Sequence, residues 1–403
     1  MSHEPPLHPS LFDVGSRLWL MHCAEGPVPR ATAKVLADFL DRELHPWLLR
    51  WPADFVSITD DVHRLAARIV NARSEDITIT TNTSTALGTI AHGYPWKPGD
   101  EVIVPLGEFP SNTVCWRALA ARGVSFREVP LWSGQQGGEA ASWESPPPTA
   151  GIDPEQALID AIGPSTRVLS ASWVRFQDGV VLDLARLGAA CRERNVTLVI
   201  DGIQGAGTLE CDASSIDAFA TGGHKGLLTP QGQGFLYTNE RLRERLVPMG
   251  SWLSVGDDEV FGRASSGEPA PWRTDGRRLE AGGLALLMLV GLRESLQLIG
   301  DAGIGRIARH VASLRTQLID GLARIPQWAA EAERLAALDA KGRLGPIVSL
   351  HHGTRGPAGL DAIVRRGMTD GIYSTVRDGF LRLAWHGYHG ADDVDRALRW
   401  LAT

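Results

Sequence analysis

Short apolar runs alternate with helical patterns between about residue 60 and about residue 240, which is the sequence form of βα units. Five of these runs are expected to be strands, at residues 77–80, 102–104, 168–171, 198–200 and 235–237. Several of the runs are apolar on both alternations, as is typical of strands that helices cover on both faces. The pattern therefore predicts an α/β fold built on a mostly parallel sheet.

The rest of the chain departs from this alternation. Residues 132–151 and 250–271 are rich in Gly and Ser and are expected to be loops. After about residue 295, helical patterns precede short strands at 347–350 and 380–384, and a last helix begins near Asp392. Because 403 residues exceed the usual size of a single core, we expect a large domain of residues 30–290 and a smaller α+β domain of residues 1–29 and 291–403.

The composition narrows the classes of function. A formal net charge of -7 provides no basic field for a phosphate backbone, so no nucleic-acid partner is expected. The most apolar run, residues 284–292, is shorter than the roughly 20 residues that cross a bilayer, and it predicts a buried helix rather than a membrane contact. Four widely spaced cysteines and an N-terminus without a signal-peptide pattern favour a cytoplasmic protein with reduced thiols and no metal site.

The segment from residue 197 to residue 237 contains the parts of a cofactor site. Asp201 ends a predicted parallel strand, where side chains point into the crevice at the carboxyl ends of the strands. Lys225 follows in a glycine-rich turn, where desolvation would lower its pKa and favour the neutral amine that forms imines. Taken singly, Asp201 is equally explained as a turn residue and Lys225 as a solvated loop lysine. Their combination favours a carboxylate that pairs with a cationic heterocycle and an amine that holds it.

These residues resemble class V of the fold-type I enzymes that use pyridoxal 5'-phosphate (PLP), a family that includes cysteine desulfurases, kynureninases and isopenicillin N epimerase-like proteins. The resemblance covers most of the chain and implies a PLP enzyme of that fold. It implies that Asp201 binds the pyridine nitrogen, that Gln204 approaches the phenolic oxygen, that His224 contacts the phosphate and that Lys225 forms the Schiff base.

Other segments match further motifs of the family. Ser84 and Thr85 open a predicted helix and match the phosphate-binding pair, although Thr83 stands where a glycine is usual. Phe109, in Glu-Phe-Pro-Ser-Asn, matches an aromatic ring that lies against the cofactor face. Arg382 alternates with apolar residues on a short strand and matches the arginine that binds the substrate α-carboxylate.

The segment from residue 278 to residue 283 implies a second subunit. The run Arg278 to Gly283 resembles a stretch that reaches the phosphate of the neighbouring subunit, with Gly283 in place of a common threonine. We therefore expect a homodimer with shared active sites, and Trp252 is expected to join the substrate-binding wall. His22 is expected near the substrate, and with Tyr388 and His386 it is a candidate proton donor on the face opposite Lys225.

The resemblance implies an external aldimine with an α-amino acid and removal of the Cα proton by Lys225. Transamination or epimerisation is the favoured outcome, since the chain has no cysteine beyond residue 211 and carries Phe109 where desulfurases place a histidine. A carbon-sulfur or other β/γ-elimination lyase without a catalytic cysteine is the alternative. A PLP-binding regulator without turnover is an alternative of another class.

Overall fold

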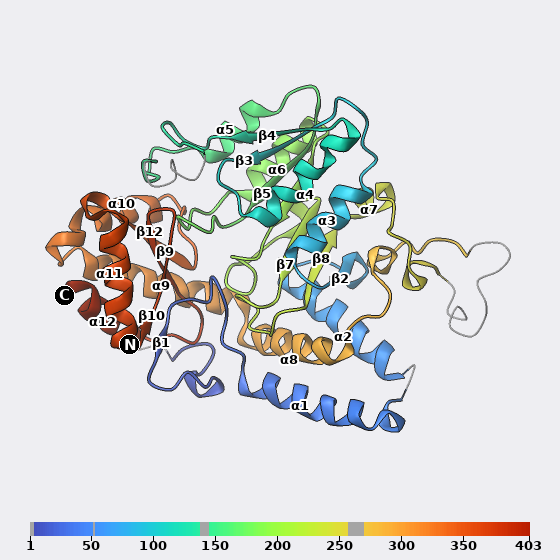
Figure 1. Ribbon diagram of the computed structural model, residues 1–403, viewed down its shortest axis with the longest axis horizontal. Helices are drawn as coiled ribbons and strands as arrows, with labels where there is room; N and C mark the ends of the chain where they lie inside the picture. Colours follow the sequence, from blue (N-terminus) through green and yellow to red (C-terminus); the bar gives the residue numbers. More distant parts are fainter. Residues whose placement is uncertain (1–3, 51–52, 138–144, 257–269) are drawn as a thin grey trace.

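A seven-stranded sheet forms the centre of the molecule. The computed structural model describes residues 4–50, 53–137, 145–256 and 270–403 (Figure 1). The strand order is β2-β8-β7-β6-β5-β3-β4, and every neighbouring pair is parallel except those of β8, which is antiparallel to β2 and to β7. The strands are β2 (Ile77–Thr80), β3 (Glu101–Pro105), β4 (Ser125–Val129), β5 (Thr166–Ser172), β6 (Thr197–Asp201), β7 (Ala218–Gly222) and β8 (Gly234–Thr238).

The predicted α/β fold is confirmed, and all five predicted strands are present within a residue or two of their expected ends. Two strands of this sheet were not predicted. β4 lies at the sheet edge and exposes alternate side chains, so it lacks an apolar run. β7 reads Ala-Phe-Ala-Thr-Gly, and its small residues give a weak strand signal although all five are buried.

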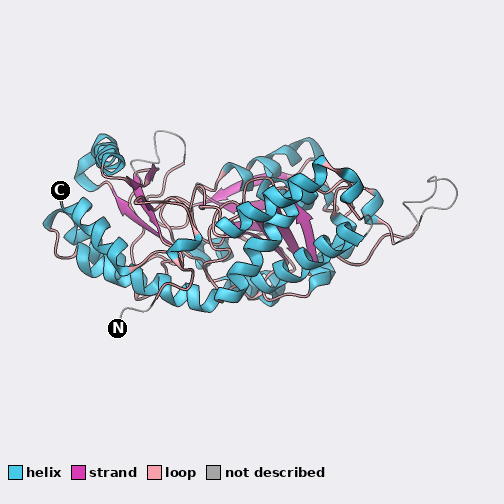
Figure 2. Cartoon of the chain, turned by 90° about the horizontal axis from the view of Figure 1, so that it is seen from below, coloured by secondary structure: helices cyan, strands magenta, loops and turns pink. Residues whose placement is uncertain are grey.

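Side chains that alternate along the strands build two separate cores, one on each face of the sheet. Val102, Val168 and Val199 pack with the helix α3 (Thr83–Gly93) on one face. Ile103, Leu169 and Leu198 enter the larger core on the other face. That core also includes α2 (Ala53–Ile69), α6 (Leu184–Glu193) and α8 (Leu286–Ala302), and Figure 2 shows helices on both sides of the strands. Burial on both faces explains the continuous apolar runs.

The remaining helices of the large sheet region lie at its periphery. They are α1 (Arg30–Leu44), which packs along α8, and α4 (Val114–Arg117), α5 (Pro154–Ala161) and α7 (Glu240–Arg245). The apolar run at residues 284–292 includes the first turns of α8, and its residues 289–292 are buried. Among the described helices, none combines the length and apolar character that crossing a bilayer requires.

A smaller layer of strands and helices lies beside the large sheet. An antiparallel sheet has the order β11-β12-β9, with β9 (Ile347–His351), β11 (Thr375–Arg377) and β12 (Phe380–Ala384). β1 (Leu18–Trp19) pairs in parallel with β10 (Ile372–Tyr373), so the N-terminal segment joins the C-terminal part of the chain (Figure 1). The helices here are α9 (Ile304–Leu322), α10 (Ala329–Asp339), α11 (Gly356–Thr369) and α12 (Ala391–Ala402). The expected domain limit near residue 290 falls inside α8, and the division stays a prediction.

The two expected loops fall partly outside the described residues, at 138–144 and 257–269. The described ends of the second loop contain a short turn of 3-10 helix, Trp252–Ser254, and a bridge between Val255 and Trp272.

Gly202 tests how tightly the strand end beside Asp201 is packed. A Cβ atom at Gly202 would lie 1.9 Å from Cζ of the buried Phe219 ring, so Gly202→Ala is expected to lower the free energy of unfolding by at least about 2 kcal/mol. Chemical denaturation of the two proteins measures this difference. Gly88→Ala is the matched control. A Cβ added at Gly88 in α3 would meet no atom within 4 Å beyond its chain neighbours and its own helix backbone, so this substitution should be neutral or slightly stabilising. Equal effects of the two substitutions would contradict the packing argument.

Candidate active site

A cavity of about 300 Å³ opens at the carboxyl ends of the parallel strands. Its lining residues follow β2, β3, β5, β6 and β7, and two further groups come from the N-terminal segment and from the hairpin β11–β12. This is where ligands bind in open α/β sheets. The predicted site residues that line it are Ser84, Phe109, Asp201, Gln204, His224, Lys225 and Arg382.

Asp201 is the last residue of β6 and only 3% of its surface is exposed. Its Oδ1 accepts a hydrogen bond of 3.1 Å from the backbone N–H of Ile203. Burial raises the pKa of Asp201 to about 7, and the charge of Glu108 adds to this rise while that of Lys225 opposes it. The carboxylate is therefore poorly solvated and gains from a cation brought to it.

Lys225 lies three residues beyond the end of β7, and its side chain is buried. Burial lowers the pKa of Lys225, whereas the charge of Asp201 raises it. The Nζ atom lies 5.6 Å from the centroid of the Phe109 ring. The N-terminal segment fixes the backbone beside the lysine, because the N–H of Gly26 donates to the carbonyl of His224 at 2.7 Å. The two segments also pack closely, since a Cβ at Gly26 would lie 2.3 Å from the carbonyl oxygen of Lys225. Lys225 is thus an amine held in one position with a reduced tendency to be protonated.

The N-terminus of α3 provides hydroxyl groups at the cavity. Asn82 caps the helix by accepting a hydrogen bond from the N–H of Thr85, and Ser84 Oγ lies 2.7 Å from Ser111 Oγ. Burial lowers the pKa of His224, which also lines the cavity. Thr85, a predicted phosphate ligand, does not line the cavity, since its hydroxyl lies 2.8 Å from Thr81 Oγ1 and its side chain faces a neighbouring apolar hollow.

Gln204 connects the cavity to the N-terminal segment. Its Nε2 donates to the carbonyl of Cys23 at 3.0 Å, and its buried Oε1 has no hydrogen-bond partner within the described chain. Cys23 and Ala24 therefore form part of the lining. The position of Cys23 in the sequence, far from the lysine and the arginine, gave no indication that its thiol would lie here.

Arg382 is placed by the loop that follows β5. Its Nη1 donates to the carbonyl of Phe176 at 2.7 Å, and its Nε is buried with no partner among the described residues. The ring of Phe176 meets the ring of Phe109 edge to face, with 5.3 Å between centroids. Ser349, opposite Arg382 in the β9–β12 register, donates to the carbonyl of Gln177 at 2.8 Å. A guanidinium fixed in this way has a donor available for an anion.

Three other predicted site residues lie outside the cavity lining. His22 is fully buried against His386, with 5.2 Å between ring centroids, and burial lowers the pKa of His22 far below its usual value. The ring of Trp252 packs against the ring of Phe55, with 5.8 Å between the ring centroids. Gly283 is exposed, with φ +71°, and a Cβ added to it would meet no atom within 4 Å. The roles expected for Gly283 and Trp252 at a second subunit stay predictions.

Sequence reasoning missed several lining residues: Cys23, Ala24, Asn82, Thr83, Ser111, Phe176, Ile203 and Arg377. Phe176 follows a predicted strand, so the rule about carboxyl ends of strands could have indicated it. Arg377 precedes Asp-Gly, a strong signal for a two-residue hairpin turn, and the same hairpin contains Arg382.

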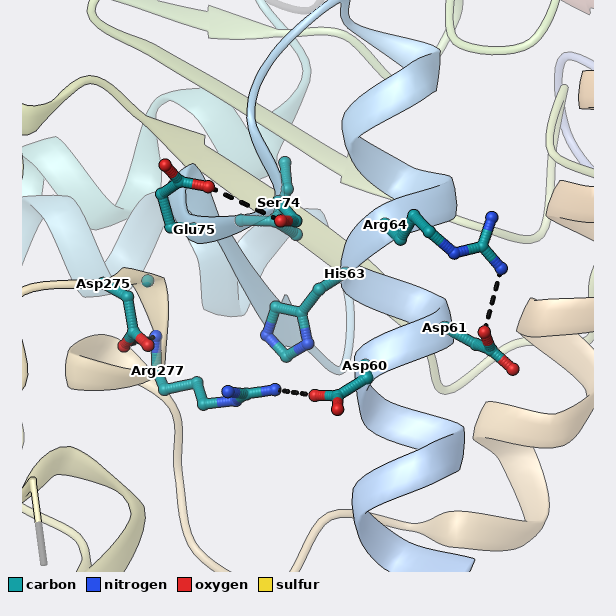
Figure 3. Close-up of a pocket in the computed structure, with 10 residues that line it drawn as sticks. Asp60, Asp61, His63, Arg64, Ser74, Glu75, Asp275 and Arg277 are labelled. Atoms are coloured by element: carbon teal, nitrogen blue, oxygen red, sulfur yellow. Dashed lines mark hydrogen bonds and ion pairs between the residues drawn. The ribbon is translucent and has the colours of Figure 1, made fainter.

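A second hollow of about 340 Å³ lies over α2 and the segment before α8, and its lining residues, drawn in Figure 3, are different from those of the first cavity. Its charged side chains largely pair with one another, as in Arg277 with Asp60 and Arg64 with Asp61. His63 also lines this hollow, and its Nε2 lies 2.7 Å from Glu280 Oε1. The same carboxylate oxygen accepts the N–H of Ile79 at the sheet edge. In the part of the chain that the structure describes, the lining of this hollow contains none of the buried unpartnered polar atoms found in the first cavity. Within the described chain, no cluster of three or more metal-ligating side chains is found.

The residues of the first cavity suit PLP. A buried carboxylate matches a ring nitrogen, a buried lysine matches an aldehyde, and hydroxyl groups at a helix N-terminus match a phosphate. The Oε1 of Gln204 and the Nε of Arg382 are buried and have no hydrogen-bond partner within the described residues, so a bound ligand could supply the missing partners.

Comparison with protein families agrees with this chemistry. The model of the aminotransferase class-V family matches residues 45–338. The chain belongs to this family. Membership confirms the family expected from the sequence, the PLP-dependent fold and PLP as the cofactor of an enzyme.

Individual relatives of this class-V chain have different activities. A probable cysteine desulfurase of Methanothermobacter thermautotrophicus is 31% identical over 64% of the chain and 60% of its own length. Isopenicillin N epimerase of Streptomyces clavuligerus is 27% identical over 92% of the chain and 90% of its own length. The chain thus spans three fifths of the first relative and most of the second.

Solved structures show the same class-V fold. A lysine-to-alanine mutant of C-DES, with glycine covalently linked to PLP, superposes with a TM-score of 0.80, at 24% identity over 96% of the chain and 97% of C-DES. The cystine C-S lyase C-DES in complex with its product cysteine persulfide gives a TM-score of 0.79 at 23% identity, over 96% of the chain and 98% of that structure.

The pKa of Asp201 predicts a pH effect on the cofactor-free protein. Because its folded-state pKa is raised from 3.8 to about 7, the folded state holds the proton more tightly than the unfolded chain, and the stability that this contributes is lost as pH rises towards about 7. Asp201→Asn removes the charge, so it should be the more stable protein, by a margin that widens with pH to at most about 4 kcal/mol near pH 8. Denaturation of both cofactor-free proteins across this pH range measures the margin. A margin that narrows as pH rises would contradict the assignment.

Proposed function

We propose that the protein transforms an α-amino acid by removing its Cα proton with Lys225, as an aminotransferase or an epimerase-like enzyme. The observation that carries the proposal is the presence in one cavity of the buried Lys225, the buried Asp201 and the partly unpartnered Arg382. These are the groups needed to hold the cofactor, keep its ring electron-poor and orient an amino acid.

When bound, PLP supplies an electron sink for the negative charge that develops at Cα. Asp201 would hold the ring nitrogen in its protonated form, since a carboxylate without solvation gains most from a nearby cation. Phe109 would cover one face of the ring, and Ser84 and His224 would bind the phosphate. Gln204 would approach the phenolic oxygen.

Lys225 is suited to act as the base, because burial lowers its pKa and leaves a larger neutral fraction at a given pH. Arg382 would bind the α-carboxylate. Arg382 lies on the small sheet, and its position relative to the lysine is set by the carbonyl of Phe176, in the loop that follows β5 of the large sheet. Groups from both sheets would therefore orient the Cα–H bond of a bound amino acid.

Epimerisation requires a second proton donor, and the buried groups near Lys225 differ in their suitability. His386 donates from Nε2 to the carbonyl of Gly226 and accepts the N–H of Gly387 at Nδ1, so both nitrogens are occupied by backbone. Both ring nitrogens of His22 and the hydroxyl of Tyr388 have no partner within the described residues. His22 and Tyr388 are therefore less occupied than His386, although both lie outside the cavity lining and burial keeps both in their neutral forms. Transamination needs neither.

A carbon-sulfur lyase is the second candidate. The thiol of Cys23 in the cavity lining favours it, together with the likeness to a probable cysteine desulfurase. Release of ammonia and a keto acid from a sulfur amino acid would support this alternative, and Cys23→Ser would show whether the thiol takes part.

We further propose a homodimer with shared sites, in which Gly283 approaches the phosphate of the partner subunit. Its exposure and positive φ leave the backbone free for such an approach. Trp252 lies beside the same segment, since a Cβ at Gly282 would meet the indole at 2.5 Å. The exposed apolar side chains of Val247 and Met249 are further candidates for the contact.

Lys225→Ala is expected to abolish turnover and Cα hydrogen exchange, because the amine that it removes both holds the cofactor and acts as the base. Borohydride reduction followed by peptide mass spectrometry should find the cofactor on the peptide that contains Lys225 in the wild type and nowhere in the variant. Solvent-deuterium exchange at Cα across an amino-acid panel, with product analysis, separates the reaction classes. Exchange at the wild-type rate in Lys225→Ala would refute the assignment.

Mixing two inactive variants tests the shared sites. Lys225→Ala and Gly283→Asp each damage a different subunit's contribution, so hybrid dimers would contain one intact site, and random mixing should restore about a quarter of the wild-type activity. Activity after subunit exchange is the measurement. No recovery from subunits that do exchange would contradict sharing.

A further inference from the structure

The cavity carries more positive charge than the proposed reaction uses. Its lining contains Lys225, Arg377 and Arg382 but one carboxylate, that of Asp201. Asp201 and Lys225 are assigned to the cofactor, and Arg382 to the substrate α-carboxylate. Arg377 has no task in the proposed function.

The hairpin β11–β12 fixes Arg377 next to Arg382. In its antiparallel register Thr375 lies opposite Arg382 and Arg377 lies opposite Phe380. Because residues two apart on a strand share a face, Arg377 projects on the same face as Arg382, as a diagonal neighbour with backbones roughly 7–8 Å apart. The connecting Asp378 and Gly379 have φ of +46° and +80°, as in the tight turns that Asp-Gly favours. The turn therefore fixes the backbone positions from which the two guanidinium groups extend.

Arg377 also has few partners. Its Nη1 donates to the carbonyl of Val376 at 2.8 Å and contacts Thr375 Oγ1 at 3.4 Å, and among the described residues no carboxylate lies within 4.0 Å of it. Other arginines near the same sheet are paired, as Arg334 is with Glu331. Burial lowers the pKa of Arg382, and the charge of Arg377 adds to this fall, as expected of two like charges at neighbouring positions of one hairpin.

We infer that the substrate is an α-amino acid whose side chain carries a second carboxylate or an equivalent oxyanion, bound by Arg377 while Arg382 binds the α-carboxylate. This rests on the proposed function, since it assumes that an amino acid occupies the cavity. A doubly anionic ligand relieves the repulsion between the two guanidinium groups, which a neutral side chain leaves in place. Arg377 is the more exposed of the pair, so its contact with the ligand is partly screened by water.

Equilibrium binding to the PLP-loaded enzyme tests the inference. Calorimetry would give dissociation constants for acidic amino acids of two or more chain lengths and for their neutral amides, which have nearly the same shape. The wild type is expected to bind the best acid about tenfold or more tightly than its amide, the size expected of one charge-assisted contact with partial exposure. Arg377→Gln should reduce this ratio to about one by weakening the acid alone, and Arg377→Lys should keep part of it.

Arg365→Gln is the matched control, because Arg365 is an exposed arginine on α11, outside the cavity lining, and should leave the ratio unchanged. A wild-type ratio near one, or a ratio that survives Arg377→Gln, would overturn the inference while leaving the proposed function intact. Equal weakening of acid and amide in Arg377→Gln would overturn it as well, since that result indicates a general role in the cavity wall. If no amino acid bound or exchanged its Cα hydrogen, the proposed function itself would fail.

Discussion

The arrangement of the site depends on the burial of one carboxylate. Asp201 ends a strand that has parallel neighbours on both sides, and the protein offers it one backbone N–H and little water. Such a group is costly to ionise unless a cation is brought to it. Lys225 has the complementary property, because its amine is also buried and is easier to leave uncharged. The sheet brings both to one edge, and the cofactor chemistry follows from this pairing.

Much of the fold could be predicted because its strands are buried on both faces. Runs such as residues 198–200 therefore read as continuous apolar segments, whereas the edge strand β4 and the small-residue strand β7 gave weak signals. The central site residues could be found for a related reason. Asp201, Lys225 and Phe109 each lie at or just beyond the carboxyl end of a strand, and local sequence specifies where a strand ends.

What the sequence did not indicate are contacts between distant segments. Cys23 reaches the cavity because β1 pairs with β10 and Gly26 packs on the lysine loop, and neither contact leaves a local pattern. Thr85 illustrates the opposite case, since its place in the motif suggested a ligand but its hydroxyl faces Thr81. A shift of one residue around a helix N-terminus separates a side chain that lines a cavity from one that does not.

The loop after β5 links the two sheets at the site. Its Phe176 supports the Phe109 ring on one side and provides the carbonyl that holds Arg382 on the other, while Gln177 is held by Ser349 of the small sheet. A rotation of the small sheet relative to the large one would therefore displace the aromatic cover and the carboxylate anchor together. Binding of the substrate carboxylate and covering of the cofactor ring therefore depend on the same short stretch of backbone.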